Sequence, residues 1–227
     1  MQILNSSLSS FSDKIELDDV VNHELIALMT QNPIHPDDFY LTGYETISFK
    51  RTREFALETV LSSVVPLDKE LLIIANNYDD LHLHKLCESY EVSSNIVSLP
   101  TADDALQGLI HQYHQLNLYS HILISCDVND PVERMQLRQI ASALQKTTLR
   151  LIVHCRRNPL RLHEINELNI AYMVFNGTGR YISSVVVANR SQLVQTEGSS
   201  RSDKMDLHEY WQKTLQRRHA AIKPMDV

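Results

Sequence analysis

The chain has 227 residues with a formal net charge of −7, and 43% of them are hydrophobic and 22% charged. This composition is typical of a soluble globular protein and is sufficient for one sizeable α/β domain. The acidic charge argues against nucleic acid as a partner, since the basic cluster that the sequence indicates is Arg217, Arg218 and His219 near the C-terminus. No run approaches the ~18 apolar residues of a membrane helix, so no membrane partner is expected.

The N-terminal part predicts little regular structure. Residues 1–15 are polar and rich in serine, and the spacing of apolar residues from Leu17 to Leu28 predicts an amphipathic helix. Asn32–Thr46 contains two prolines and is predicted to be a loop. A helix is then predicted over Thr52–Val64, ending before Pro66. We therefore treat residues 1–50 as a lead-in.

From Leu71 onward, short apolar runs alternate with helical segments. The predicted strands are Leu71–Ala75, Asn95–Leu99, His121–Ser125, Leu149–His154, Ile170–Phe175 and Ile182–Ala188. The predicted helices are Asp79–Tyr90, Thr101–Gln115, Pro131–Gln145, Leu162–Leu168 and Asp206–Arg218. This alternation indicates βαβ units, and hence an α/β fold with a mainly parallel sheet covered by helices on both faces. No linker divides residues 51–220, so a single domain is expected there.

The three cysteines, Cys87, Cys126 and Cys155, are widely spaced and form no CxxC pair. A disulfide framework or zinc site is not expected, and buried free thiols are the simpler interpretation. A reducing, cytoplasmic location fits this pattern. The pairs His82/His84 and His111/His114 lack nearby ligands that would complete a metal site.

Several stretches carry a resemblance to a known family. They are FALETVLSSVVP (55–66), LLIIANNYDDLHLHKLCESYEV (71–92), residues 121–132, LIV (151–153), residues 185–190 and GSSRSDKMDLHEYW (198–211). In order and spacing they resemble the class V pyridoxal-phosphate (PLP) aminotransferases, specifically the 2-aminoethylphosphonate–pyruvate branch. The resemblance covers residues 55–211 and implies the large domain of fold-type I PLP enzymes. It also implies a dimer, and a C-terminal small domain that we expect to be absent here.

Transamination with PLP needs a lysine that forms the Schiff base and an acid beside the pyridine nitrogen. In the family the lysine follows the strand matched by Ile170–Phe175. Here that position reads NGTGR (176–180), and no lysine occurs between Lys146 and Lys204. Arg180 cannot form the imine, because its guanidinium stays protonated. The resemblance places His154 where the family has aspartate.

The phosphate site of the family also differs. Its Gly-Ser-Gly-Thr turn is matched by Arg51-Thr52-Arg53-Glu54, which lacks glycine and adds a negative charge at the helix start. The family also has a threonine-rich motif, Glu-Thr-(Ser/Thr)-Thr-Gly, which is matched here by Cys126-Asp127-Val128-Asn129-Asp130. Four features of the cofactor site are thus altered while the hydrophobic framework is retained.

We therefore hypothesise a pseudo-aminotransferase without catalytic residues, acting as an interaction or regulatory protein in a homodimer or in a heterodimer with an active relative. No cofactor is expected. The alternative is an aminotransferase-like enzyme or small-molecule binder that uses the old cleft, with PLP as the alternative cofactor. In that case the polar residues of the cleft would be His154, Asn129, Thr52, Thr178 and Arg180. No metal ligands are predicted.

Overall fold

The computed structural model describes residues 43–75, 81–100, 103–177 and 184–222. Its strands are β1 (Tyr44–Phe49), β2 (Glu70–Ala75), β3 (Ser94–Ser98), β4 (Tyr119–Cys126), β5 (Arg150–Cys155), β6 (Ile170–Asn176) and β7 (Ser184–Asn189). Its helices are α3 (Phe55–Val64), α4 (Leu81–Ser89), α5 (Asp103–Leu116), α6 (Pro131–Leu144), α7 (Leu162–Glu167), α8 (Arg190–Val194) and α9 (Leu207–Ile222).

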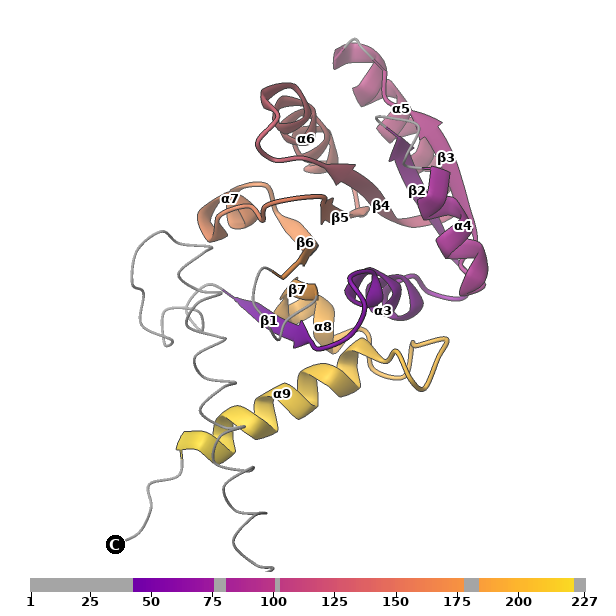
Figure 1. The fold of residues 1–227 in the computed structure, drawn as a ribbon. Helices are drawn as coiled ribbons and strands as arrows, with labels where there is room; N and C mark the ends of the chain where they lie inside the picture. Colours follow the sequence, from indigo (N-terminus) through magenta and orange to yellow (C-terminus); the bar gives the residue numbers. More distant parts are fainter. Residues whose placement is uncertain (1–42, 76–80, 101–102, 178–183, 223–227) are drawn as a thin grey trace, which may run out of the picture.

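The strands form one seven-stranded sheet in the order β1-β7-β6-β5-β4-β2-β3 (Figure 1). Parallel pairing joins β3 to β2, β2 to β4, β4 to β5 and β5 to β6. Strand β7 is antiparallel to both of its neighbours, β6 and β1. The C-terminal ends of the parallel strands therefore meet at one edge of the sheet, which we call the carboxyl edge. The opposite edge is the amino edge.

Helices cover both faces of the sheet (Figure 1). On one face, α5, α6 and α7 contribute Leu106, Leu137 and Ile165 to a buried cluster. On the other face, a second cluster includes side chains of α3, α4, α8 and α9. The central strands read as continuous apolar runs because both of their faces are buried. The predicted α/β fold with a mainly parallel sheet is thus confirmed.

Most predicted elements are present with boundaries that differ by a few residues, but the loop prediction for Asn32–Thr46 is wrong at its end. Residues Tyr44–Thr46 belong to β1, which pairs with β7 along its whole length. The sheet therefore begins within the predicted lead-in. The short helix α8 was also not predicted, and the amphipathic helix predicted near Leu17 lies outside the described residues.

Candidate cofactor site at the carboxyl edge

Strand β4 runs into α6 through a tight turn at the carboxyl edge. The Asp127 carboxylate accepts a hydrogen bond from the Asn129 backbone N–H at 3.0 Å. Asp130 then caps α6, because its side chain accepts from the N–H groups of Val132 and Glu133. Pro131 occupies the first turn, where it loses no helical hydrogen bond. The turn exposes the Asn129 side chain at this edge.

His154 lies one residue before the end of β5, opposite Ser125 of β4. Its Nδ1 is 3.1 Å from the Ser125 Oγ. Burial, and to a lesser extent the nearby His82 and Arg156, together lower the pKa of His154 to about 4. The imidazole is therefore neutral at neutral pH, and it places no fixed charge beside a ligand.

An ion-pair network covers the ends of β4 and β5. The Arg156 guanidinium donates to both Glu133 oxygens, at 2.6 and 2.8 Å, and to the Ser125 carbonyl at 3.3 Å. Glu133 also accepts from the Asp127 N–H at 2.7 Å. Asp127 in turn pairs with Arg157 at 3.2 Å. Several polar groups at this edge are thus already paired with side chains of the same chain.

The sequence reading did not single out Arg156 or Glu133. A signal for Glu133 exists, since an acid three residues after an N-cap is the pattern of a capping box. Its carboxylate nevertheless contacts the Asp127 N–H rather than the N-cap N–H. The partner Arg156 could not be deduced from spacing, because it lies in the loop after β5, 23 residues from Glu133 of α6.

The segment between β1 and α3 completes the described part of the edge. The Thr52 carbonyl accepts from the Phe55 N–H at 3.2 Å and from the Ser184 hydroxyl at 3.3 Å. Glu54 occupies the N-cap position of α3 without a capping hydrogen bond from its side chain, and Glu58 lies in the first turn. The start of α3 is therefore lined by carboxylates, which oppose an anion there.

The structure places Thr52, Asn129 and His154 at the same edge of the sheet, next to β7, β4 and β5 respectively. Thr178 and Arg180 lie outside the described residues. Their roles, and those of the other three, stay predictions. Within the described ranges, no group of three or more His, Cys, Asp or Glu side chains is placed to hold a metal ion. No described helix is both long and apolar enough to cross a membrane.

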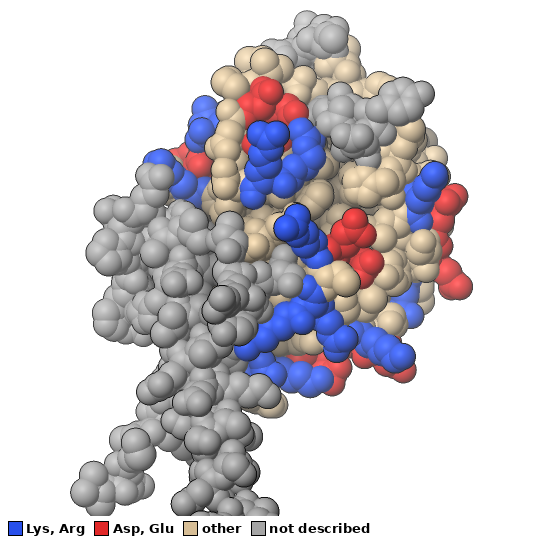
Figure 2. Space-filling view, viewed as in Figure 1, with Lys and Arg blue, Asp and Glu red and all other residues tan. Residues whose placement is uncertain are grey.

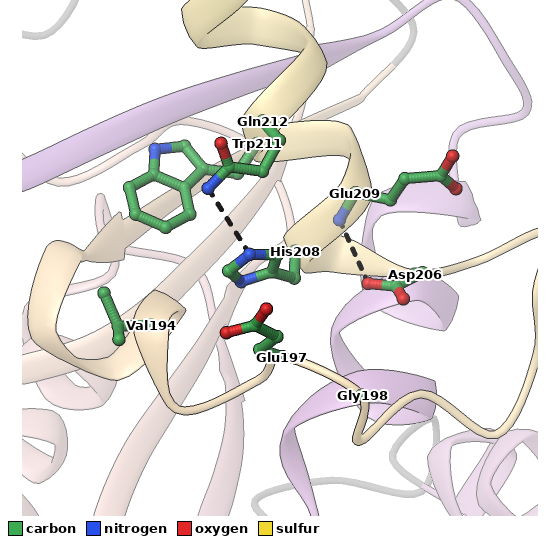
Figure 3. Close-up of a pocket in the computed structure, with 8 residues that line it drawn as sticks. All are labelled: Val194, Glu197, Gly198, Asp206, His208, Glu209, Trp211 and Gln212. Carbon is green, nitrogen blue, oxygen red and sulfur yellow. Dashed lines mark hydrogen bonds between the residues drawn. The ribbon is translucent and has the colours of Figure 1, made fainter.

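A separate surface hollow lies near the amino edge, between α8 and the start of α9 (Figure 3). Its acidic lining residues are Glu197, Asp206 and Glu209. His208 also lines it, with Nδ1 3.3 Å from the Leu193 carbonyl and Nε2 3.3 Å from the Gln212 amide nitrogen. Three carboxylates around one opening disfavour an anionic cofactor, so the carboxyl edge remains the candidate site.

No protein-family model matches the chain. Curated relatives do match over most of it. A 2-aminoethylphosphonate–pyruvate transaminase of Bacteroides fragilis is 19% identical over 207 residues, which cover 86% of this chain and 53% of the relative. The enzyme of the same name from Aeromonas hydrophila is 22% identical over 188 residues, covering 76% of this chain and 47% of the relative. The chain thus spans about half the length of these relatives.

Solved structures show the same architecture. An alanine–glyoxylate aminotransferase of Nostoc sp. superposes with a TM-score of 0.57 at 14% identity, covering 87% of this chain and 52% of the other. A ureidoglycine–glyoxylate aminotransferase of Bacillus subtilis gives a TM-score of 0.54 at 12% identity, with 82% and 51% covered. The predicted resemblance is confirmed: the chain is similar to the 2-aminoethylphosphonate–pyruvate transaminases of class V and has the large-domain fold of the PLP-dependent aminotransferases.

Proposed function

We propose that this protein is a pseudo-aminotransferase, an aminotransferase-like chain that acts by binding another protein rather than by transamination. This chain matches about half of each curated relative. Three properties of the carboxyl edge support the proposal, and each is a mismatch with what PLP chemistry needs from a protein.

The observation that carries the proposal is the neutral His154 on β5. The sequence resemblance aligns this residue with the aspartate that holds the pyridinium proton in the family. Burial keeps the pKa of His154 at about 4, and its Nδ1 is already within hydrogen-bond distance of Ser125. A neutral imidazole supplies no negative charge to stabilise a protonated pyridine.

The amine is the second mismatch. Strand β6 ends at Asn176, and the sequence from there to Lys204 contains no lysine. Arginine at position 180 is not a substitute, because its guanidinium does not lose the proton that imine formation requires. A Schiff base at the position implied by the resemblance therefore has no nucleophile in this chain.

The phosphate position is the third mismatch. Glu54 and Glu58 lie at the start of α3, and the Arg51 guanidinium stacks on the Phe55 ring at 5.3 Å. A carboxylate at the N-cap and another in the first turn oppose the dianionic phosphate that the family binds there. The described residues thus do not fit PLP in the family's mode, and we derive no reaction step through it.

A small-molecule binder is the second candidate function. It is favoured by the partial exposure of His154 and by the exposed Asn129, which follow neighbouring strands at the carboxyl edge. α/β sheets commonly bind ligands at this edge. A neutral imidazole can donate one hydrogen bond and accept another, so an uncharged polar ligand suits it better than an acid.

Titration of the purified protein with PLP tests the proposal. We expect no absorbance band of a protein-bound imine, and after borohydride reduction an intact mass without a pyridoxyl adduct at any single site. A stoichiometric adduct mapped to one lysine would refute the proposal and restore the enzyme hypothesis. Saturable binding without an adduct would favour the binder. Ovalbumin treated identically corrects for nonspecific labelling of surface lysines.

The partner is part of the same proposal. We infer a second copy of this chain or an active aminotransferase relative, since the resemblance implies a dimer. Light scattering of the chain alone, and again after mixing with such a relative, distinguishes the two. A monomer in both samples would contradict either partner.

A reducing, cytoplasmic location is also proposed, and the support for it is that all three cysteines are free and buried.

A further inference from the structure

Helix α6 exposes apolar side chains on the face that points away from the sheet. Leu137 and Ile140 face the core and are fully buried. Val132 and Met135, which are three residues apart and share the outward face, are 57% and 53% exposed. Methionine is enriched in protein interfaces and depleted on ordinary solvated surface. This face is therefore not a typical polar helix surface.

Arginines lie close to these apolar residues in the sequence. Between residues 127 and 164 the sequence has seven Lys and Arg and four acidic residues, Asp127, Asp130, Glu133 and Glu164, although the whole chain has a net charge of −7. This stretch is therefore a second basic region, besides the cluster of Arg217, Arg218 and His219. Blue side chains gather over α6 and the segment beside it in Figure 2, with a few acidic ones between them.

A buried carboxylate holds two of these arginines. Glu164 of α7 is only 6% exposed, and it contacts Arg134 closely and Arg138 at 3.8 Å. Since one carboxylate serves two guanidinium groups, a positive charge is left over. The Arg138 side chain is 60% exposed and Arg134 is 43% exposed, so this charge reaches solvent.

The arrangement is also fixed before any partner arrives. Glu164 accepts from the Arg161 N–H at 3.2 Å, which fixes the carboxylate at the start of α7. Arg157, whose side chain is 76% exposed, is anchored by Asp127 at 3.2 Å. Anchored arginines lose less conformational entropy on binding than free ones.

We propose that the surface formed by Val132, Met135, Arg134, Arg138 and Arg157, here named the α6 surface, docks an acidic segment of a partner protein that also carries apolar side chains. This inference rests on the proposed function, of which it names the binding surface and the partner chemistry. Exposed apolar side chains on the same helix as Arg134 and Arg138 favour such a segment over nucleic acid, because phosphates make no contact that needs them. Carboxylates pair bidentately with guanidinium groups.

A fluorescein-labelled synthetic helix of glutamate and leucine is the probe, and its anisotropy is measured against the full chain at low and high salt. We expect saturable binding that weakens with salt. Arg138→Glu should weaken it by about tenfold or more, because the substitution reverses a charge on the same helix as the apolar side chains. Met135→Ser should weaken it severalfold at both salt concentrations, since an apolar contact is not screened.

Arg217→Glu is the matched control, because it makes the same charge change at an exposed position of α9. Equal losses in Arg138→Glu and Arg217→Glu would overturn the proposal, as would no binding or equal binding of a lysine–leucine helix. Preferential binding of duplex DNA would also overturn it. If the chain forms no PLP adduct and does not bind the labelled helix, only the proposed role of the α6 surface is refuted. If a PLP adduct forms, the proposed function itself is refuted.

Discussion

His121 is a buried titratable residue that serves no candidate site. It lies near the start of β4 with 6% of its surface exposed, and its Nδ1 is 2.8 Å from the Ser120 hydroxyl. Burial, and to a lesser extent the nearby Arg150, together lower the pKa of His121 to about 3. The folded protein therefore keeps this ring neutral at pH values where the unfolded chain protonates it.

This difference predicts acid sensitivity. With an unfolded pKa near 6.5, the unfolded state binds more protons than the folded state below that pH. Stability should be constant above about pH 6.5 and fall as the pH drops toward 4, by up to roughly 1.4 kcal/mol per pH unit for each buried histidine. His154, with its pKa lowered to about 4, adds a similar contribution.

Urea unfolding of His121→Gln at several pH values checks this expectation. The variant should lose less stability than the parent between pH 6.5 and 4, whatever its stability at pH 7. His111→Gln, at an exposed position of α5, should retain the slope of the parent. Identical slopes for the parent and His121→Gln would mean that this ring is protonated in the folded state.

Single residues also show what sequence reasoning could reach at the candidate site. Asn129 and His154 were placed at the carboxyl edge because each lies at the end of a recognisable apolar strand. The contact of Arg156 with Glu133 was out of reach, because it depends on the packing of a loop against a helix. Position along the strand was predictable, but the choice of partner was not.

At the scale of elements, β1 was missed because its polar residues break the apolar pattern. Glu45 is buried with 2% exposure, and it pairs with Arg190 after β7 and with Arg218 of α9. These partners lie 145 and 173 residues away in the sequence. The short α8 was missed for a related reason: Asn189 caps it, but five residues show no helical period.

The Glu45 cluster predicts a large effect of its removal. Glu45→Ala leaves two partly exposed arginines without their carboxylate, which should cost about 1–3 kcal/mol of unfolding free energy. Glu209→Ala breaks the exposed pair with Lys213, whose two side chains are each 52% exposed, and should cost less than about 1 kcal/mol. Chemical denaturation gives the loss of unfolding free energy for both variants. If Glu45→Ala loses as little as Glu209→Ala, the pairs of Glu45 with its arginines do not stabilise β1.

At the scale of the whole molecule, one sheet separates two apolar layers. Adjacent residues of β2 belong to different layers. Leu71 is part of the cluster with α3, α4, α8 and α9, and Leu72 is part of the cluster with α5, α6 and α7. Trp211, the single tryptophan, is buried in the first of these layers. Because the strands are shared, we expect both layers to unfold together.

Leu72→Ala tests this coupling. The cavity that this substitution leaves in the layer with α5, α6 and α7 should lower the unfolding free energy by about 2–5 kcal/mol. The same loss should appear in Trp211 fluorescence, which reports the other layer, and in far-UV circular dichroism. A fluorescence transition that stays at the parental midpoint while the dichroism transition moves would show that the layers unfold separately.

The pairing of β1 with β7 has a consequence for folding during synthesis. Every other pairing in the sheet joins strands closer in sequence, whereas Phe49 pairs with Ser184 and Tyr44 with Asn189. At the usual ribosomal rate the emerging chain needs roughly 7 to 28 s to pass from β1 to β7. During that time β1 carries unpaired backbone groups and a carboxylate without its arginines. The segment of the chain that emerges early is therefore the one that a chaperone has the longest opportunity to bind.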